Sequence, residues 1–168
     1  MIVGRLTKMA LVLLTATAVP LLAQTPPIFR YISIAPYGRL ELGGPFAHRA
    51  QLGKPLGPQL YELQGPGGVH AQFADTERLL IELDNKDRIR TFYFLYLPGK
   101  AFGPAKAEYV ESLGQPAAER RYDSAGVAVK RAVWQDAKTE FELRAARPKD
   151  GPERVASRLR DRTGIRPK

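Results

Sequence analysis

The side-chain types that most often perform chemistry are scarce in this 168-residue chain, and none stands in a spacing that defines a known site. His48 and His70 are not four residues apart on one helix, a spacing that lets two imidazoles bind one zinc ion. None of the four serines lies in the Gly-x-Ser-x-Gly pattern of a nucleophile elbow. The absence of cysteine excludes thiol nucleophiles, thiolate zinc sites and iron–sulfur clusters.

Acidic residues gather between residues 77 and 87, where they could suggest calcium binding or paired-carboxylate catalysis. The residues concerned are Glu77, Glu82, Asp84 and Asp87. The stretch DNKD, residues 84–87, does not match the spacing of a calcium-binding EF-hand loop, and its polar residues are typical of a tight turn between strands. The Gly-rich stretch 64–68 lacks the lysine and helix start of a phosphate-binding loop. We therefore predict no catalytic activity, no metal and no cofactor.

An aromatic stretch, RIRTFYFLYL at residues 88–97, is the strongest strand signal. In a strand, Phe92, Phe94 and Tyr96 share one face, and Tyr93 and Leu95 lie on the other. A sheet covered by helices on one side needs only one apolar face. The second face is either covered by another part of the chain or exposed to bind a protein or peptide. The predicted protein-binding residues are Phe92, Phe94, Tyr96 and Trp134; the alternative is that they belong to the core.

The positive charge is concentrated at the C-terminal end. Residues 24–143 contain 15 Lys and Arg against 14 Asp and Glu, whereas residues 144–168 contain nine against three. Because the body is nearly neutral, we do not predict nucleic-acid binding. Residues 147–168 are predicted to be a basic tail, either disordered or weakly helical. Its arginines would contact lipid headgroups, lipopolysaccharide or an acidic protein; the candidate anion-binding residues are Arg154, Arg158, Arg160 and Arg162.

The N-terminal segment, residues 1–23, has the layout of a secretory signal peptide. Two cations, Arg5 and Lys8, precede an apolar run over residues 9–19. That run is shorter than the roughly 20 residues needed to span a bilayer. We predict a periplasmic or secreted protein without a transmembrane segment in its mature form; an uncleaved anchor is the alternative.

The remaining sequence predicts short helices and strands. Helices are expected over residues 45–52 and 103–113, each followed by a glycine that ends it. Strands are expected over residues 28–34, 69–73, 79–83, 88–97, 120–123, 127–134 and 139–145. The period-two alternation of residues 127–145 is typical of half-buried antiparallel strands.

Two parts of the chain share a pattern 61 residues apart. Residues 52–75 begin LGKP and residues 113–136 begin LGQP; Tyr61 matches Tyr122, Phe73 matches Trp134, and Asp75 matches Asp136. We predict an α+β fold of two αβββ repeats, each a helix packed on an antiparallel sheet, which share one core because a single unit would bury too little apolar surface. The repeats are assigned to residues 24–100, with a preceding strand, and 101–146. Chance similarity is the alternative.

A family resemblance accompanies this pattern. The stretch GPAKAEYVESLGQP, residues 103–116, is followed over residues 133–143 by Val, Trp, Asp, Thr, Phe and Leu in that order. Over about residues 40–145 the chain resembles the small α/β module of the BamE (SmpA/OmlA) family and the tandem fold of β-lactamase-inhibitor proteins. The resemblance implies a protein that binds other proteins and does not catalyse a reaction. The chain lacks the lipidated cysteine of BamE-type proteins, so outer-membrane anchoring is not implied.

The sequence thus predicts an exported, non-catalytic binding protein of the cell envelope that contacts a protein or peptide through an apolar sheet face. Anion binding through the basic tail is the alternative function. An enzyme of an unrecognised type would require a cleft with converging polar groups.

Overall fold

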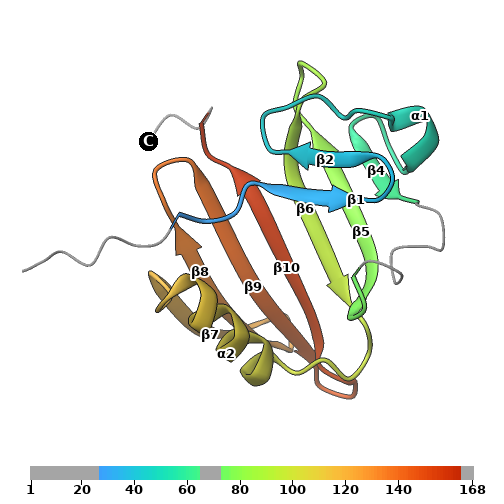
Figure 1. Ribbon diagram of the computed structural model, residues 1–168. Coiled ribbons are helices and arrows are strands. Elements are labelled where there is room, and N and C mark those ends of the chain that lie inside the picture. Colours follow the sequence, from blue (N-terminus) through green and yellow to red (C-terminus); the bar gives the residue numbers. More distant parts are fainter. Residues whose placement is uncertain (1–26, 65–72, 164–168) are drawn as a thin grey trace, which may run out of the picture.

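The computed structural model describes residues 27–64 and 73–163, and its main element is an eight-stranded antiparallel sheet (Figure 1). In spatial order the strands are β3 (Gly53–Pro55), β4 (Leu60–Leu63), β5 (Thr76–Leu83), β6 (Ile89–Tyr96), β10 (Arg154–Asp161), β9 (Thr139–Pro148), β8 (Val127–Gln135) and β7 (Ala118–Ser124). Two four-strand meanders, β3–β6 and β7–β10, meet where β6 pairs with β10, with Phe92 opposite Leu159.

One face of the sheet, here called the inner face, is covered by two different elements (Figure 1). Helix α2 (Phe102–Leu113) lies over β8 and β9, and the hairpin of β1 (Tyr31–Ile34) and β2 (Gly38–Glu41) crosses β6 and β10. Backbone hydrogen bonds from Gly43 N to Ile89 O and from Ile89 N to Gly44 O, both 2.8 Å, join the end of the hairpin to β6. The apolar side chains of both covers and of the sheet form one continuous core.

The predicted fold of two αβββ repeats is wrong. The described residues contain two helices, and the first, α1 (Arg49–Leu52), is only four residues long. The helix expected over residues 45–52 is shortened because His48 adopts a left-handed conformation with φ 58°, which is incompatible with a continuing helix. The β1–β2 hairpin covers the part of the sheet where the first helix was expected to pack.

The two matched glycines show why the sequence similarity misled. Gly114 ends α2 with φ 76°, which favours glycine, and so follows the expected pattern. Gly53 has an extended backbone, and space around it is restricted: a Cβ there would lie 2.9 Å from Arg49 O and 3.0 Å from the ring of Phe46. The same short motif therefore satisfies two different physical requirements.

The prediction for the C-terminal segment is also corrected. Residues 154–161, expected in a disordered or weakly helical tail, form β10 in the middle of the sheet. Val155, Ser157 and Leu159 point into the core, and Arg158 and Arg160, at the alternate positions, point to the opposite, outer face. The carboxylate of Glu153, just before β10, accepts a hydrogen bond of 3.0 Å from the Phe102 N–H at the start of α2.

Several local predictions are confirmed. The helix expected over residues 103–113 is α2, and the expected strands 88–97, 120–123, 127–134 and 139–145 correspond to β6, β7, β8 and β9. The DNKD turn joins β5 to β6: Asp84 Oδ1 accepts backbone hydrogen bonds from Lys86 N at 2.8 Å and Arg88 N at 2.9 Å. The predicted signal peptide, residues 1–23, and the strand predicted over residues 69–73, except Phe73, lie outside the described residues.

Candidate functional site

The four aromatic residues predicted to form an exposed binding face lie on the inner face of the sheet and are buried. Phe92 and Trp134 are 0% and 1% exposed, and Phe94 and Tyr96 are each 8% exposed. Trp134 packs against Phe141 and donates an indole hydrogen bond of 2.8 Å to Gly114 O. The predicted contact surface is corrected accordingly, because the two covering elements remove most of these side chains from solvent.

Two of those four residues nevertheless reach a groove, here called the aromatic groove, which opens between the β1–β2 hairpin and α2. The groove has a volume of about 540 Å³. Six aromatic side chains from separate parts of the chain line it: Phe29, Tyr31, Phe73, Phe94, Tyr96 and Tyr109. Phe29 and Tyr31 at its edge are 37% and 41% exposed. The ring centroids of Phe73 and Phe94 are 6.1 Å apart, within the range for favourable aromatic contacts.

Polar groups at the edge of the aromatic groove pair with one another. The Lys100 ammonium lies 2.8 Å from Asp75 Oδ2 and 3.2 Å from Glu108 Oε2. The hydrogen bond with Asp75 is the main reason why the pKa of Lys100 is raised above its ordinary value. The ammonium therefore stays charged at neutral pH. The groove has a charged rim in which one cation pairs with two carboxylates, which gives a formal net charge of −1.

The hydroxyl of Tyr96 is satisfied at the bottom of the groove. It lies 2.6 Å from the Tyr109 hydroxyl and 2.7 Å from Ser157 Oγ. Burial is the main cause of a pKa raised far above the ordinary value, so the phenol stays protonated. These hydrogen bonds fix the Tyr96 ring, and they leave its apolar surface as the part that a ligand would contact.

The arginines predicted to bind anions in a tail belong instead to ion pairs on the outer face. Arg158 lies 3.1 Å from Glu140 Oε1 and 2.8 Å from Glu142 Oε2, and Arg160 lies 3.0 Å from Glu140 Oε1. The register of β9 and β10 places these residues opposite one another. The glutamates pair with the Nη2 atoms of both guanidinium groups, and the Nε atoms are buried, so these arginines are poorly suited to bind another anion.

The other two candidate arginines are placed differently. Arg154 is 3.7 Å from Glu77, and both side chains are about half exposed, so this pair is weak. Arg162 donates a hydrogen bond of 2.9 Å to the backbone oxygen of Asp136. The four predicted arginines therefore do not form one anion-binding cluster.

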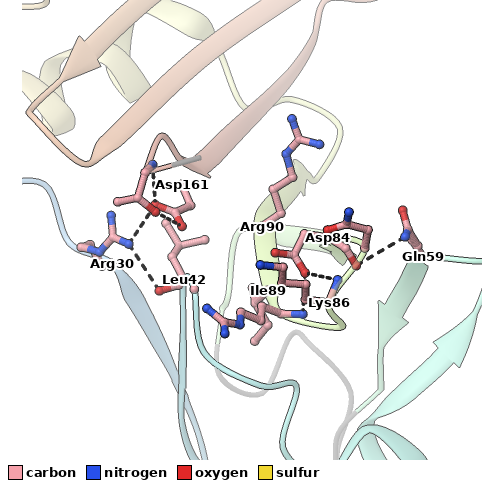
Figure 2. Close-up of a pocket in the computed structure, with 12 residues that line it drawn as sticks. Arg30, Leu42, Gln59, Asp84, Lys86, Ile89, Arg90 and Asp161 are labelled. Carbon is pink, nitrogen blue, oxygen red and sulfur yellow. Dashed lines mark hydrogen bonds and ion pairs between the residues drawn. The ribbon is translucent and has the colours of Figure 1, made fainter. Parts of the chain in front are cut away.

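A second hollow, here called the basic cleft, lies where β6 and β10 separate beside the end of the hairpin (Figure 2). It has a volume of about 830 Å³. Its charged lining residues are Arg30, Lys86, Arg88, Arg90, Asp84 and Asp161, which give it a formal net charge of +2. Figure 2 shows Arg30 and Asp161 on one side, the Asp84 turn on the other, and Arg90 extending between them.

Arg30 links its own segment to three others at one wall of the basic cleft. Its guanidinium donates hydrogen bonds to Leu42 O at 3.3 Å, Lys138 O at 2.9 Å, Thr139 Oγ1 at 2.8 Å and Asp161 Oδ1 at 3.0 Å. Although burial alone would raise the pKa of Asp161, hydrogen bonds from Thr163 and Arg30 lower it below its ordinary value. Asp161 is therefore ionised at neutral pH, and Arg30 acts as a structural clamp.

The histidines and the acidic cluster have ordinary surroundings. The ring of His48 packs on Tyr37, with centroids 5.2 Å apart, and His70 lies outside the described residues. Asp87 pairs with Arg49 at 3.2 Å. In the described part of the chain, no three His, Asp or Glu side chains are grouped to hold a metal ion. Over the same residues, no helix combines the length and hydrophobicity needed to cross a membrane.

Sequence reasoning missed most residues of both hollows. Phe29 and Tyr31 alternate with buried Ile28 and Ile32, so the exposed positions of the first strand were a usable signal. The cations at residues 86, 88 and 90 surround a turn that was interpreted only as solvated. No sequence signal shows that the aromatic residues of the groove, or the charged residues of the cleft, lie close together. Each hollow combines segments that are far apart in the chain.

No protein-family model, curated protein or solved structure matches this chain. The resemblance to BamE-type and β-lactamase-inhibitor-protein modules therefore stays a prediction.

Proposed function

We propose that this chain is an exported, non-catalytic binding protein that holds an apolar segment of a polypeptide in the aromatic groove. The observation that supports this function is the convergence of six aromatic side chains on one groove of about 540 Å³. Export rests on the signal peptide predicted from residues 1–23.

The composition of the groove is that of a binding interface. Aromatic residues are enriched in the buried centres of protein interfaces, and polar residues surround them. Here Phe94 and Tyr96 line the interior, and Tyr31 and Phe29 stand at the edge. An apolar side chain entering the groove would displace water from these rings and gain about 25 cal/mol for each Å² of apolar surface buried.

The charged rim favours a polypeptide over a purely apolar small molecule. Asp75, Lys100 and Glu108 lie next to the rings, and Ser33 of β1 also lines the groove. Backbone amides and carbonyls flanking an apolar side chain can hydrogen-bond to such groups. The paired rim has a formal net charge of only −1, so affinity would depend mainly on apolar contacts and only weakly on salt.

The test begins with selection of peptides from a random 12-residue library against the full chain without residues 1–23. Affinities of the enriched peptides are then measured by calorimetry for the unchanged chain and for Tyr31→Ser. Replacing one of the few dominant residues at the centre of an interface, among which Tyr is enriched, weakens binding by about 2 kcal/mol or more. For the more peripheral Tyr31 we expect about a tenfold loss.

Tyr122→Ser is the matched control, because Tyr122 is also a strand tyrosine and is 43% exposed against 41% for Tyr31. It lies on β7, at the far edge of the sheet. We expect its peptide affinity to be unchanged. Equal losses in the two variants, or enrichment of no peptide whose binding depends on Tyr31, would refute the proposal.

A further inference from the structure

The basic cleft contains cations that its own carboxylates do not neutralise. Asp161 is paired with Arg30, and Asp84 Oδ1 accepts hydrogen bonds from two backbone N–H groups of its turn. Lys86, Arg88 and Arg90 form no ion pair with any carboxylate of the described residues, and all three are exposed. The pKa of Asp84 is lowered mainly by the backbone hydrogen bond from Arg88 and also by the charges of Arg88 and Lys86, so this carboxylate offsets one of the three cationic charges. Because the Arg30–Asp161 pair cancels, the cleft keeps a formal net charge of +2.

The position of Arg90 is set by an irregularity of the sheet. Glu82 of β5 pairs with Thr91, whereas the next residue, Leu83, pairs with Ile89, so Arg90 has no counterpart on β5. On its other side, the pairing of β6 with β10 ends at Thr91. Such a bulge redirects a side chain out of the regular sheet, and bulges are over-represented beside functional sites. Here the residue that the bulge inserts is one of the three cations lining the cleft.

The backbone on the opposite wall leaves room near these charges. Gly43 has φ 82°, and a Cβ there would be 3.4 Å from Asp161 Oδ2. A side chain at this position would be strained and would reduce the space beside the Arg30–Asp161 pair. This wall of the cleft thus consists of the Gly43 backbone and of the Arg30–Asp161 pair, whose hydrogen bonds are already formed.

From these features we infer that the basic cleft binds a doubly charged oxyanion, a phosphate group, through Lys86, Arg88 and Arg90. Guanidinium groups match the geometry of phosphate oxygens, and lysine adds a compact charge. A phosphate dianion offers three strong acceptor oxygens, which fits three cationic side chains better than a single carboxylate does. The phosphate could belong to a soluble compound or to a lipid headgroup, since the recognising chemistry is the same.

This inference is independent of peptide binding, because the residues that line the basic cleft and those that line the aromatic groove do not overlap. Calorimetry with pyrophosphate as the soluble probe tests the cleft directly. For the full chain without residues 1–23 we expect one saturable site whose affinity falls as salt rises. We expect Arg90→Gln to weaken binding at least fivefold, and Arg88→Gln/Arg90→Gln to weaken it further.

Arg144→Gln is the matched control. Arg144 is also an exposed strand arginine without an ion pair among the described residues, and it lies on β9 rather than in the cleft. Its pyrophosphate affinity should equal that of the unchanged chain. Circular dichroism and urea unfolding of each variant show whether the fold is intact, and Lys86→Gln supplies a second, independent loss of charge in the cleft.

A sedimentation assay with phosphatidylglycerol vesicles identifies the source of the phosphate. Vesicle binding that pyrophosphate displaces and Arg90→Gln weakens would assign the site to a lipid headgroup. Saturable pyrophosphate binding without vesicle binding would assign it to a soluble compound. The inference is overturned if neither probe saturates at millimolar phosphate, if binding survives unchanged in the cleft variants, or if Arg144→Gln weakens it as much as they do.

Discussion

The aromatic groove and the basic cleft differ in how their charges are satisfied. In the aromatic groove, the Lys100 ammonium is 2.8 Å from Asp75 and 3.2 Å from Glu108, so the charges of the rim are paired within the protein and leave a formal net charge of −1. In the basic cleft, Asp161 is paired with Arg30, and Lys86, Arg88 and Arg90 outnumber the one remaining carboxylate, Asp84, which leaves a formal net charge of +2. Burial of apolar surface is therefore the main force available in the groove, and electrostatic attraction is the main one in the cleft.

The two hollows also differ in their relation to the core. The aromatic groove ends on Phe94 and Tyr96, which belong to the continuous core, whereas the cations of the cleft project from a turn and a bulge. A site that shares its residues with the core cannot change without affecting stability. A site on a turn can change with little effect on the fold, and the following predictions test this difference.

The largest expected effect comes from the core beneath the aromatic groove. Phe141 is fully buried and packs against Tyr109, with ring centroids 4.4 Å apart. Phe141→Ala should lower the free energy of unfolding by about 3–5 kcal/mol, through lost burial and the cavity left behind. Urea unfolding should still show one cooperative transition, because both meanders share the core. A separate transition for each meander would contradict this.

A smaller loss is expected at the wall of the basic cleft. Arg30→Gln removes charge-assisted hydrogen bonds that join four segments and should lower the free energy of unfolding by about 1.5–3 kcal/mol. Arg39→Gln is the control, since Arg39 is 53% exposed, forms one ion pair of 3.5 Å with Glu41 and stacks 3.6 Å over the exposed Tyr31 ring. That change should stay within about 1 kcal/mol. Equal losses would show that Arg30 is not a clamp.

Stability should fall on acidification, and two aspartates contribute to this. The pKa of Asp161 is lowered, and that of Asp136 is lowered by backbone hydrogen bonds that outweigh its burial. Below the ordinary value of 3.8, the unfolded chain binds protons that the folded chain does not, so the free energy of unfolding decreases as the pH falls. Unfolding measured from pH 7 to pH 3 should show this loss.

Asp136→Asn should lower stability at pH 7 and reduce the difference between pH 7 and pH 3. The amide keeps an acceptor but no longer titrates. An acid-induced loss as large as that of the unchanged chain would show that Asp136 does not contribute to the pH dependence.

The smallest effect is expected at the bulge. Arg90 is exposed and has no ion pair within the described residues, so Arg90→Gln should change the free energy of unfolding by less than about 0.5 kcal/mol. Thermal unfolding with and without 0.5 M NaCl checks this. A clear destabilisation would mean that Arg90 supports the fold, and any loss of phosphate binding in this variant would then need a structural explanation.

The sequence predicted the local elements better than their arrangement. The alternation in residues 127–145 and the helical spacing in α2 are local signals, and both elements are present. The strand β10 also alternates, with Val155, Ser157 and Leu159 inward. Its outward arginines made it look like a solvated tail. Their partners, Glu140 and Glu142, are 16 to 20 residues away, so composition alone could not show that these charges are paired.

The candidate sites were predicted less well than the local elements. The aromatic strand was identified, but the side on which it is covered depends on the β1–β2 hairpin, whose contacts with β6 are non-local. Phe94 and Tyr96 were expected on an open face of the sheet, whereas they line the interior of a groove. The cleft depends on a one-residue shift in the pairing of β5 and β6. No residue type in that stretch indicates a bulge.

The central place of β10 has a consequence for the order of events during synthesis. The ribosome releases the meander β3–β6 first and β7–β9 next, and the strand that joins them is the last one in the described part of the chain. Until β10 emerges, β6 and β9 each present an unpaired edge rich in apolar residues, which is a template for association with another chain. A nascent chain interrupted before residue 154 would hold both halves of the sheet without the strand that unites them.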